Sequence, residues 1–236
     1  MKRKSCLIEN CDTCALRAKV VLCDIEGSDL GEFQKIKRTL DYAPHQTVFY
    51  EGHVCLGLYL LCAGKVKLTR SSARGQRQIV RILGPGELIE KHALGERALH
   101  EVTCETLEPS QVCVIDKERY LALIHRNPQL AIKLIQLLSN EHGVNMDQLD
   151  QFTFKAARER LAGLLLELGD RFGGESADRV QVGLMLKREE IAEMAGITVE
   201  TAIRLLSVFR DEGLLTIEGR AITLLNPDRL ARIARR

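Results

Sequence analysis

The sequence predicts an α+β protein in which an N-terminal antiparallel β-domain, a sandwich or a roll, precedes a long helix and a C-terminal winged helix-turn-helix. Three observations carry this prediction. Short β-rich segments separated by glycines occupy residues 47–115, a long helical pattern begins at Pro128, and the last third is helical with one hairpin. The expected domains are a Cys-rich arm at 1–24, the β-domain at 25–127, the long helix at 128–153 and the winged helix-turn-helix at 154–236.

Length and composition exclude several classes of protein. Of the 236 residues, 45% are hydrophobic and 28% are charged, as in ordinary globular domains. No apolar run approaches the roughly 18 residues of a membrane helix, and the basic residues 2–4 are not followed by the apolar segment of a signal peptide. We therefore expect a cytoplasmic protein with no membrane partner. The balance of 34 basic against 32 acidic residues does not by itself indicate a nucleic-acid partner.

The N-terminal arm carries cysteines at a spacing that suits metal binding. The chain contains eight cysteines, and in a reducing cytoplasm metal binding or redox chemistry is a better expectation than a disulfide framework. Within the arm, the pattern Cys11-x2-Cys14-x8-Cys23 is compatible with zinc or with an iron–sulfur cluster, because thiolates are ligands for both. Cys6 lies five residues upstream of Cys11. Redox-active thiols are the alternative interpretation of the same pattern.

The β-domain is predicted from six short segments rich in β-branched and aromatic residues, with glycines between them. The segments are 47–50, 58–62, 65–69, 78–83, 101–104 and 111–115. The remaining cysteines are dispersed through this part of the chain. We expect Cys55, Cys62 and Cys104 to be core residues, and the apolar surroundings of Cys113 predict that it too is a buried strand residue.

A long helix is predicted from Pro128 to about residue 152, because proline is well tolerated in the first turn of a helix. Six side chains on it recur at the alternating spacing of a coiled-coil seam and define the expected homodimer interface. They are Ile135, Leu138, His142, Asn145, Leu149 and Phe152. The two polar residues in the middle would weaken the pairing while fixing its register. The alternative is a helix that packs on its own β-domain.

The C-terminal region has the pattern of a helix-turn-helix with a wing. Helices are expected at 156–172, 186–195 and 199–212, and two strands around a turn at 214–224. Small Ala192 would let the last two helices approach, Gly196 would make the turn between them, and Thr198 would accept a hydrogen bond from an amide of the next helix. The first turns of the last helix would then enter a DNA major groove.

Arginine can bond guanine and glutamate can accept from cytosine in the major groove, and the segment contains both. The candidate DNA-contacting residues are Lys187, Arg188, Thr198, Val199, Glu200, Ile203 and Arg204. The alternative is an ordinary helical hairpin in which Glu200 and Arg204 form a surface pair one turn apart.

The segment Thr198-Val-Glu-Thr-Ala-Ile-Arg-Leu-Leu206 resembles the recognition helix of the Crp/Fnr superfamily of transcription regulators, and specifically its oxygen-sensing Fnr branch. The resemblance covers essentially the whole chain. It implies a β-roll of the cyclic-nucleotide-binding kind (a double-stranded β-helix), a dimerisation helix and a winged helix-turn-helix. It also implies that Glu200 and Arg204 read the G·C pair of a TTGAT-like half-site. That branch usually has serine immediately before this arginine, and here the residue is Ile203. The difference would affect recognition of the outer bases of the half-site.

The resemblance further implies an oxygen-labile [4Fe–4S] cluster, held by three arm cysteines and one distant cysteine. Matched by position, the ligands would be Cys11, Cys14, Cys23 and Cys113. The gap between Cys14 and Cys23 is longer than the commonest family spacing, which leaves Cys6 as a substitute for Cys23. Loss of the cluster would release the arm from the β-roll and so change dimerisation and promoter binding.

The partners implied by the resemblance are double-stranded DNA with an inverted repeat, a second copy of the chain, and RNA polymerase, contacted through the loop 71–77. Two alternatives stay open. The segment 86–88, Gly-Glu-Leu, resembles the cyclic-nucleotide branch, although residues 99–102 lack its phosphate cradle. A structural zinc site or a thiol redox switch is the second. An enzyme has little support, because no phosphate loop, HExxH motif or nucleophile elbow is present.

Overall fold

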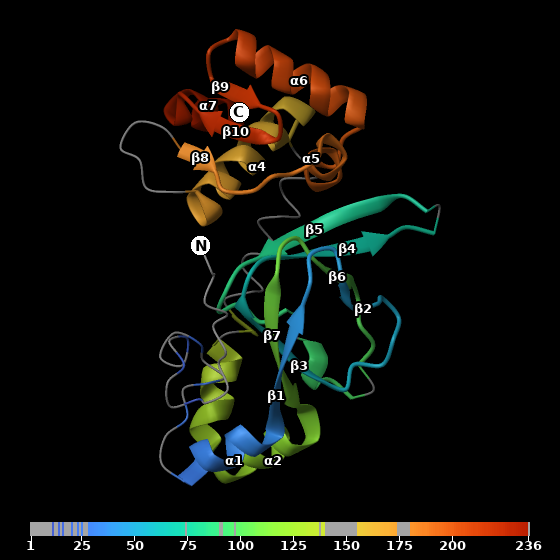
Figure 1. Ribbon diagram of the computed structural model, residues 1–236, viewed down its shortest axis with the longest axis vertical. Coiled ribbons are helices and arrows are strands. Elements are labelled where there is room, and N and C mark those ends of the chain that lie inside the picture. The colour runs from blue at the N-terminus through green and yellow to red at the C-terminus, as the bar shows by residue number, and fades with distance from the viewer. Residues whose placement is uncertain are drawn as a thin grey trace. The chain divides into compact units, whose positions relative to one another are not determined.

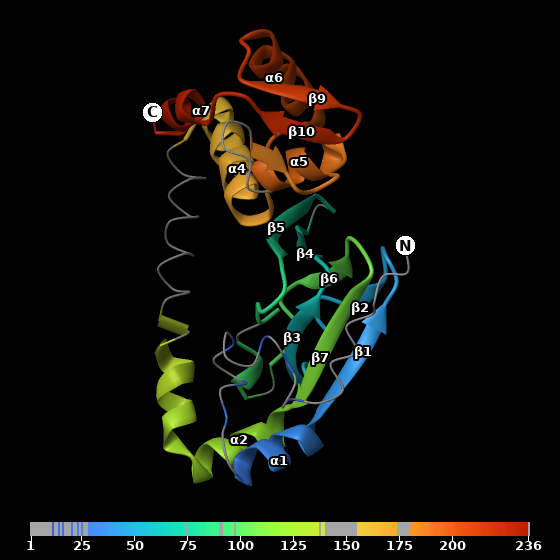
Figure 2. The same cartoon turned by 60° about the vertical axis from the view of Figure 1, so that its left-hand side comes forward.

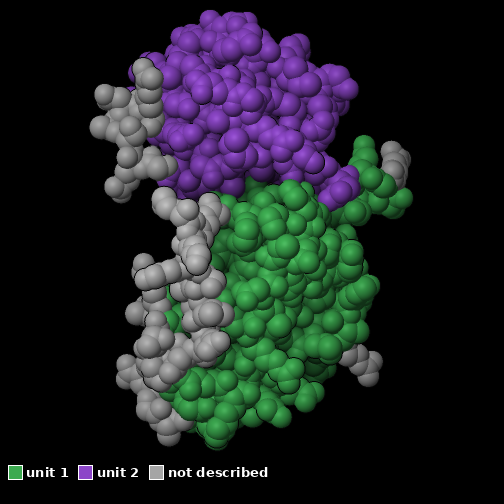
Figure 3. Space-filling model, viewed as in Figure 1, with its two compact units in different colours: residues 1–76, 80–143 green, residues 77–79, 144–236 purple. Residues whose placement is uncertain are grey.

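The computed structural model describes residues 11, 14, 16, 20, 23, 25, 28–73, 75–89, 92–96, 98–136, 138, 139, 155–173 and 180–235. The chain divides into two compact units, which Figure 3 distinguishes by colour. The first unit comprises Met1–Gln76 and Val80–Gly143, and the second comprises Arg77–Ile79 and Val144–Arg236.

The β-domain contains two sheets, with the strand orders β1-β7-β3 and β2-β6-β4-β5 (Figure 1). The strands are β1 (Lys37–Tyr42), β2 (Thr47–Phe49), β3 (Gly57–Ala63), β4 (Val66–Ser71), β5 (Arg77–Leu83), β6 (Thr103–Thr106) and β7 (Ser110–Asp116). Strand β7 pairs antiparallel with β1 and β3, and β6 pairs antiparallel with β2 and β4. Each of the six predicted segments overlaps a strand, although β6 begins two residues later than expected.

In the described part of the first unit, four elements were not predicted. They are α1 (Ser28–Ile36), β1, the short 3-10 helix η4 (His92–Leu94) and α2 (Lys117–Arg126). Strand β1 lies at an edge of its sheet, so several of its side chains are exposed and its sequence lacks a continuous apolar pattern. Helix α2 begins directly after β7, where the side chain of Asp116 accepts a hydrogen bond from the Arg119 amide at 2.9 Å. Helices α1 and α2 pack side by side (Figure 2).

Both faces of β3 and β7 are buried, each against a different core. Leu60 and Cys113 belong to one cluster of buried side chains, whereas their neighbours Leu61 and Val112 belong to the other. This division follows from the two-residue period of a strand. Cys55, Cys62 and Cys104 are 4%, 8% and 0% exposed, so the expectation that they are core residues is confirmed.

A second helical segment follows α2 directly. Residues 128–136, 138 and 139 are helical, which confirms that a helix begins at Pro128. The expected continuation to residue 152 lies outside the described residues. Over the part of the chain that the structure describes, no helix combines the length and the apolar composition that crossing a bilayer requires.

The second unit is a small α+β domain. Its elements are α4 (Ala157–Phe172), β8 (Val180–Val182), α5 (Arg188–Ala195), α6 (Val199–Asp211), β9 (Leu215–Glu218), β10 (Ala221–Leu224) and α7 (Pro227–Ala234). The strands form an antiparallel sheet of order β8-β10-β9, and α4 packs against α7. The predicted helices and hairpin are confirmed, whereas β8 and α7 were not predicted. The α+β class, with an antiparallel β-domain before the helical domain, is confirmed as well.

Helix α4 ends at Phe172, as predicted. A glycine after a helix commonly adopts the left-handed conformation. Gly173 instead has φ −70° and ψ 156°, which is extended backbone. A Cβ atom there would clash with the carbonyl oxygen of Gly169 and lie 2.8 Å from that of Gln181. Glycine is therefore required by the close approach of backbone, not by the backbone angle.

Candidate functional site

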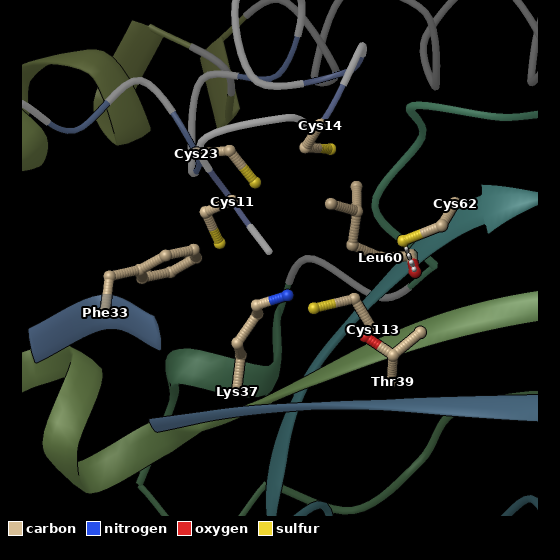
Figure 4. A pocket seen from close by; sticks show the side chains of 9 residues that line it. All are labelled: Cys11, Cys14, Cys23, Phe33, Lys37, Thr39, Leu60, Cys62 and Cys113. Atoms are coloured by element: carbon tan, nitrogen blue, oxygen red, sulfur yellow. Dashed lines mark hydrogen bonds between the residues drawn. The ribbon is translucent and has the colours of Figure 1, made fainter. Parts of the chain in front are cut away.

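Five cysteines from the arm and from the sheet line one cavity (Figure 4). They are Cys11, Cys14, Cys23, Cys62 and Cys113. In the arm, the Cys14 amide donates to the Cys11 carbonyl at 3.3 Å, so these two cysteines lie in one tight turn. The Cys23 amide donates to the carbonyl of Val20 at 2.9 Å. Such turns allow a short segment to present several thiols to the same point.

The face of the β1-β7-β3 sheet forms the opposite wall of this cavity. Cys113 on β7 lies between its two cross-strand partners, Thr39 on β1 and Leu60 on β3. Cys62 lies two residues after Leu60 on β3, and Lys37 lies two residues before Thr39 on β1. Because side chains two residues apart on a strand share a face, both project from the same face as Cys113. A shift of strand register by one residue would turn Cys113 into the other core.

The pKa values of Cys23 and Cys113 are raised above the usual range, whereas the hydrogen bond with Cys113 lowers that of Cys62. Burial raises the pKa of Cys23 to about 12, and the neighbouring thiols Cys11, Cys14 and Cys62 add to this effect. A hydrogen bond between the thiols of Cys62 and Cys113, together with burial, raises the pKa of Cys113 far above its usual value. Ligands bind metals as thiolates, so occupation of this site would release protons.

The donor set consists of thiols, whose thiolates are ligands for zinc and for iron–sulfur clusters alike. In a [4Fe–4S] cubane each cysteine binds a different iron, so the four sulfurs surround the cluster without meeting at one point. Within the described residues, no three His, Cys, Asp or Glu side chains are grouped closely enough to hold one metal ion. The space between the thiols is about 20 Å³, room for about one water molecule. A cluster would therefore need the thiols to lie farther apart than they do here.

All four cysteines that the family resemblance names as ligands lie at this cavity. Cys6, the candidate substitute, lies outside the described residues. Cys62 is buried, as expected, but it also faces the cavity, which the sequence did not suggest. The sequence gives no sign of this position, because it depends on how β3 is aligned with β7. The same holds for Lys37.

The helix-turn-helix has the geometry that its sequence predicts. Gly196 follows α5 with φ 61° and ψ 44°, the left-handed conformation that glycine adopts without strain. The hydroxyl oxygen of Thr198 accepts a hydrogen bond from the Thr201 amide at 3.3 Å and so caps α6. Ala192 is 2% exposed, as expected for a small residue where two helices meet. The predicted roles of all three residues are confirmed.

The candidate base-contacting side chains lie on the outer face of α6. Glu200, Ile203 and Arg204 are exposed, as is Thr198, and Val199 is half-buried. Hydrogen bonds from its own backbone amide and from the Thr198 hydroxyl lower the pKa of Glu200. Glu200 is therefore a hydrogen-bond acceptor at neutral pH, which is what an amino group of cytosine requires.

Lys187 and Arg188, at the start of α5, differ in what they contact. Lys187 is exposed. Arg188 is half-buried, and its Nη2 atom donates to the carbonyl oxygen of Gly219 at 3.0 Å, in the turn between β9 and β10. Arg188 thus joins the wing, the hairpin of β9 and β10, to the first helix of the helix-turn-helix.

Sequence reasoning missed Arg160 on α4. Its Nε atom donates to the carbonyl oxygen of Ala195 at 2.9 Å, and its Nη2 atom donates to that of Gly196 at 3.0 Å. Both carbonyls belong to the end of α5 and the turn that follows. No local pattern marks this residue, because its partners lie 35 and 36 positions along the chain.

Only the first part of the predicted dimer seam is described. Ile135 and Leu138 are 61% and 38% exposed, so in the single chain these apolar side chains are not covered by the β-domain. The other four seam residues, His142, Asn145, Leu149 and Phe152, lie outside the described residues.

The segment that resembles a cyclic-nucleotide site has its acidic group engaged locally. The Oε2 atom of Glu87 accepts a hydrogen bond from the Gly84 amide at 2.7 Å, and the carboxylate lies 3.9 Å from the guanidinium of Arg81. Glu87 therefore stabilises its own turn.

Comparison with known proteins matches both domains. Residues 39–127 match the family of the cyclic nucleotide-binding domain, and residues 159–233 match that of the Crp-like helix-turn-helix domain. The chain is 29% identical over 226 residues to the fumarate and nitrate reduction regulatory protein of Escherichia coli (strain K12), covering 95% of this chain and 90% of that protein. It is 26% identical over 211 residues to the CRP-like cAMP-activated global transcriptional regulator of Mycobacterium tuberculosis (strain CDC 1551 / Oshkosh), covering 89% and 94%.

A solved structure shows the same architecture over most of its length. FixK2 from Bradyrhizobium japonicum superimposes with a TM-score of 0.72 at 25% identity, covering 84% of this chain and 97% of that one. The expected cyclic-nucleotide-binding-like β-domain before a helix-turn-helix is thus confirmed. The relative from Escherichia coli is named as a regulatory protein, and the relative from Mycobacterium tuberculosis is named as a transcriptional regulator. The two matched domains and the shared fold show that this chain belongs to the Crp/Fnr family of DNA-binding transcription regulators.

Proposed function

We propose that this regulator is of the Fnr type, and that an oxygen-labile [4Fe–4S] cluster switches its dimerisation and its binding to promoters. Cys11, Cys14, Cys23 and Cys113 would hold the cluster. The observation that carries the proposal is that three thiols of the arm and one thiol of β7, far apart in the sequence, line the same cavity.

When bound, such a cluster supplies iron that oxygen can oxidise. The protein's own cysteines would connect the arm to the sheet through the cluster, with thiols of the arm on one side and Cys113 on the other. Because the arm and β7 are joined through the same group, loss of that group removes the connection.

A continuous set of contacts leads from the cavity to the helix that begins at Pro128. Phe33 on α1 lines the cavity, and its ring contacts the ring of Tyr120 on α2 edge-on, with centroids 6.2 Å apart. At the end of α2, the side-chain amide of Asn127 donates to the carboxylate of Asp29 on α1 at 3.2 Å. A shift of the arm would thus act on α1, then on α2, and then on the expected dimer seam.

A homodimer would present two copies of α6 to DNA, which explains the expected inverted repeat. Glu200 and Arg204 would contact the G·C pair of each half-site, and Lys187 would contact phosphate. RNA polymerase would be contacted through the loop 71–77, between β4 and β5.

Metal analysis of protein purified without oxygen tests this proposal. We expect iron and acid-labile sulfide in equal amounts, and a broad visible absorption that disappears in air. Serine in place of Cys11, Cys14, Cys23 or Cys113 should remove the iron and sulfide together with the visible absorption. Cys55→Ser is the matched control, since Cys55 is equally buried and a serine hydroxyl can donate to the same Gly57 carbonyl, 3.2 Å from the thiol. Zinc in place of iron would contradict the proposal.

A second candidate is a Crp-like regulator that senses a cyclic nucleotide or another small ligand. The match of residues 39–127 to the cyclic nucleotide-binding domain favours it. The local engagement of Glu87 speaks against it, because its carboxylate would have to leave the Gly84 amide to reach a ligand. Calorimetric titration with cyclic AMP distinguishes the two. Binding that raises DNA affinity in iron-free protein would favour the second candidate.

A further inference from the structure

A positively charged side chain faces the cysteine cavity. The amino group of Lys37, the first residue of β1, points toward the space that the thiols surround (Figure 4). Among the described residues that line this cavity, the others are the five cysteines, Phe33, Thr39 and Leu60, so Lys37 alone carries a full positive charge. The strand fixes its place, because Lys37 lies two residues before Thr39, the cross-strand partner of Cys113.

Lys37 shares the cavity with thiols of both walls. Cys11, Cys14 and Cys23 line it from the arm, and Cys113 lines it from the sheet. A cation near anionic ligands stabilises their charged form. One ammonium group therefore faces the space between the arm and the sheet, which a cluster held by these cysteines would occupy (Figure 4).

We propose that Lys37 controls how readily dioxygen oxidises the cluster. This inference rests on the proposed function. Four thiolates carry more negative charge than the cluster core carries positive charge, so the assembled site is anionic. In the oxidation, one electron passes from the cluster to dioxygen, which becomes superoxide, and the site becomes one unit less negative. An adjacent ammonium group stabilises the more anionic state, before the electron leaves, and so slows the step.

The test measures the first-order loss of cluster absorbance after air is added to anaerobically purified protein. Lys37→Met keeps the length of the side chain and removes the charge, and Lys37→Arg keeps the charge. We expect Lys37→Met to lose its absorbance about tenfold faster than the unmodified protein, and Lys37→Arg to stay within about twofold of it. Lys35→Met is the matched control, because Lys35 lies two residues earlier but is exposed and paired with Glu32 at 3.0 Å.

Each outcome decides the inference. Equal rates in Lys37→Met and the unmodified protein, both with full iron, would overturn it and leave the proposed function intact. If Lys37→Met assembles no cluster while Lys37→Arg does, the requirement for the charge is supported. If neither assembles one, the shape of lysine is what matters, and the role of the charge is refuted. Absence of iron from the unmodified protein would overturn the proposed function, and this inference with it.

Discussion

The guanidinium of Arg160 donates a hydrogen bond to the carbonyl oxygen of Gly196 at 3.0 Å, and this contact joins α4 to the turn of the helix-turn-helix. The same group also donates to the carbonyls of Ala195, at 2.9 Å, and Lys155, at 2.8 Å. The last carbonyls of a helix have no partner within the helix. Arg160 supplies one at the end of α5, and it thereby fixes the turn that sets the direction of α6.

Replacing Arg160 by methionine should therefore destabilise the second unit and weaken DNA binding. The substitution keeps most of the apolar stem but leaves the carbonyls of Ala195 and Gly196 without their donor. Loss of hydrogen bonds to a charged group costs about 1–3 kcal/mol, which should appear in chemical denaturation. Arg171→Met on the same helix is the control, because its pair with Glu167 is a surface contact four residues away. Equal effects of the two substitutions would refute the role of Arg160.

Arg204 should determine the preference for one base pair. If it bonds guanine with two hydrogen bonds, Arg204→Ala should cost about 1–3 kcal/mol and remove selection at that position alone. Glu200→Ala should relax selection at a cytosine of the same half-site. Lys187→Ala should weaken all sequences alike and reduce the salt dependence. Selection of sites from random DNA checks all three.

The control for this experiment is Arg210, which is exposed on the last turn of the same helix and pairs with Asp211 at 3.0 Å. Only the N-terminal part of a recognition helix reaches base edges, so Arg210→Ala should leave the selected sequence unchanged. The selected sites should be inverted repeats with half-site centres about 10–10.5 base pairs apart. Recovery of no repeat would contradict the assignment of α6 as the recognition helix.

The elements that could be predicted are those whose pattern is local. Strands β3 and β7 are apolar runs between turn residues, and the roles of Gly196 and Thr198 depend only on their immediate neighbours. Strand β1 could not be predicted in this way, because the charged residues Lys37, Arg38 and Asp41 leave it without a continuous apolar pattern. It is recognised only through its pairing with β7.

The residues of the candidate metal site also differ in whether a local pattern reveals them. The spacing of Cys11, Cys14 and Cys23 indicates a metal-binding arm without any knowledge of the fold. The positions of Cys62 and Lys37 depend instead on the register of β1, β7 and β3, which pairs segments distant in the sequence. Local patterns carry no information on such a register, so these two residues could be found only from the structure.

Ile135 should contribute to a homodimer interface. It is 61% exposed in the single chain, so a charge there should not disturb the folded monomer. Ile135→Lys would place two like charges in an apolar seam, and we expect it to weaken dimerisation by about two orders of magnitude. Sedimentation of anaerobic, cluster-loaded protein measures this. Gln136→Lys, at the exposed next position outside the seam, should remain dimeric. An unchanged dimer in Ile135→Lys would refute the seam.

A pair of single substitutions should decide the fourth ligand. Cys23 is 8% exposed and faces the cavity, so Cys23→Ser should lose iron and sulfide, because a hydroxyl cannot replace the soft thiolate. Cys6→Ser should retain both, as should the Cys55→Ser control. Iron analysis and visible spectra of anaerobically purified protein give the result. An intact cluster in Cys23→Ser, with loss in Cys6→Ser, would transfer the role to Cys6. Retention in both would point to Cys62, whose thiol faces the same cavity and contacts that of Cys113.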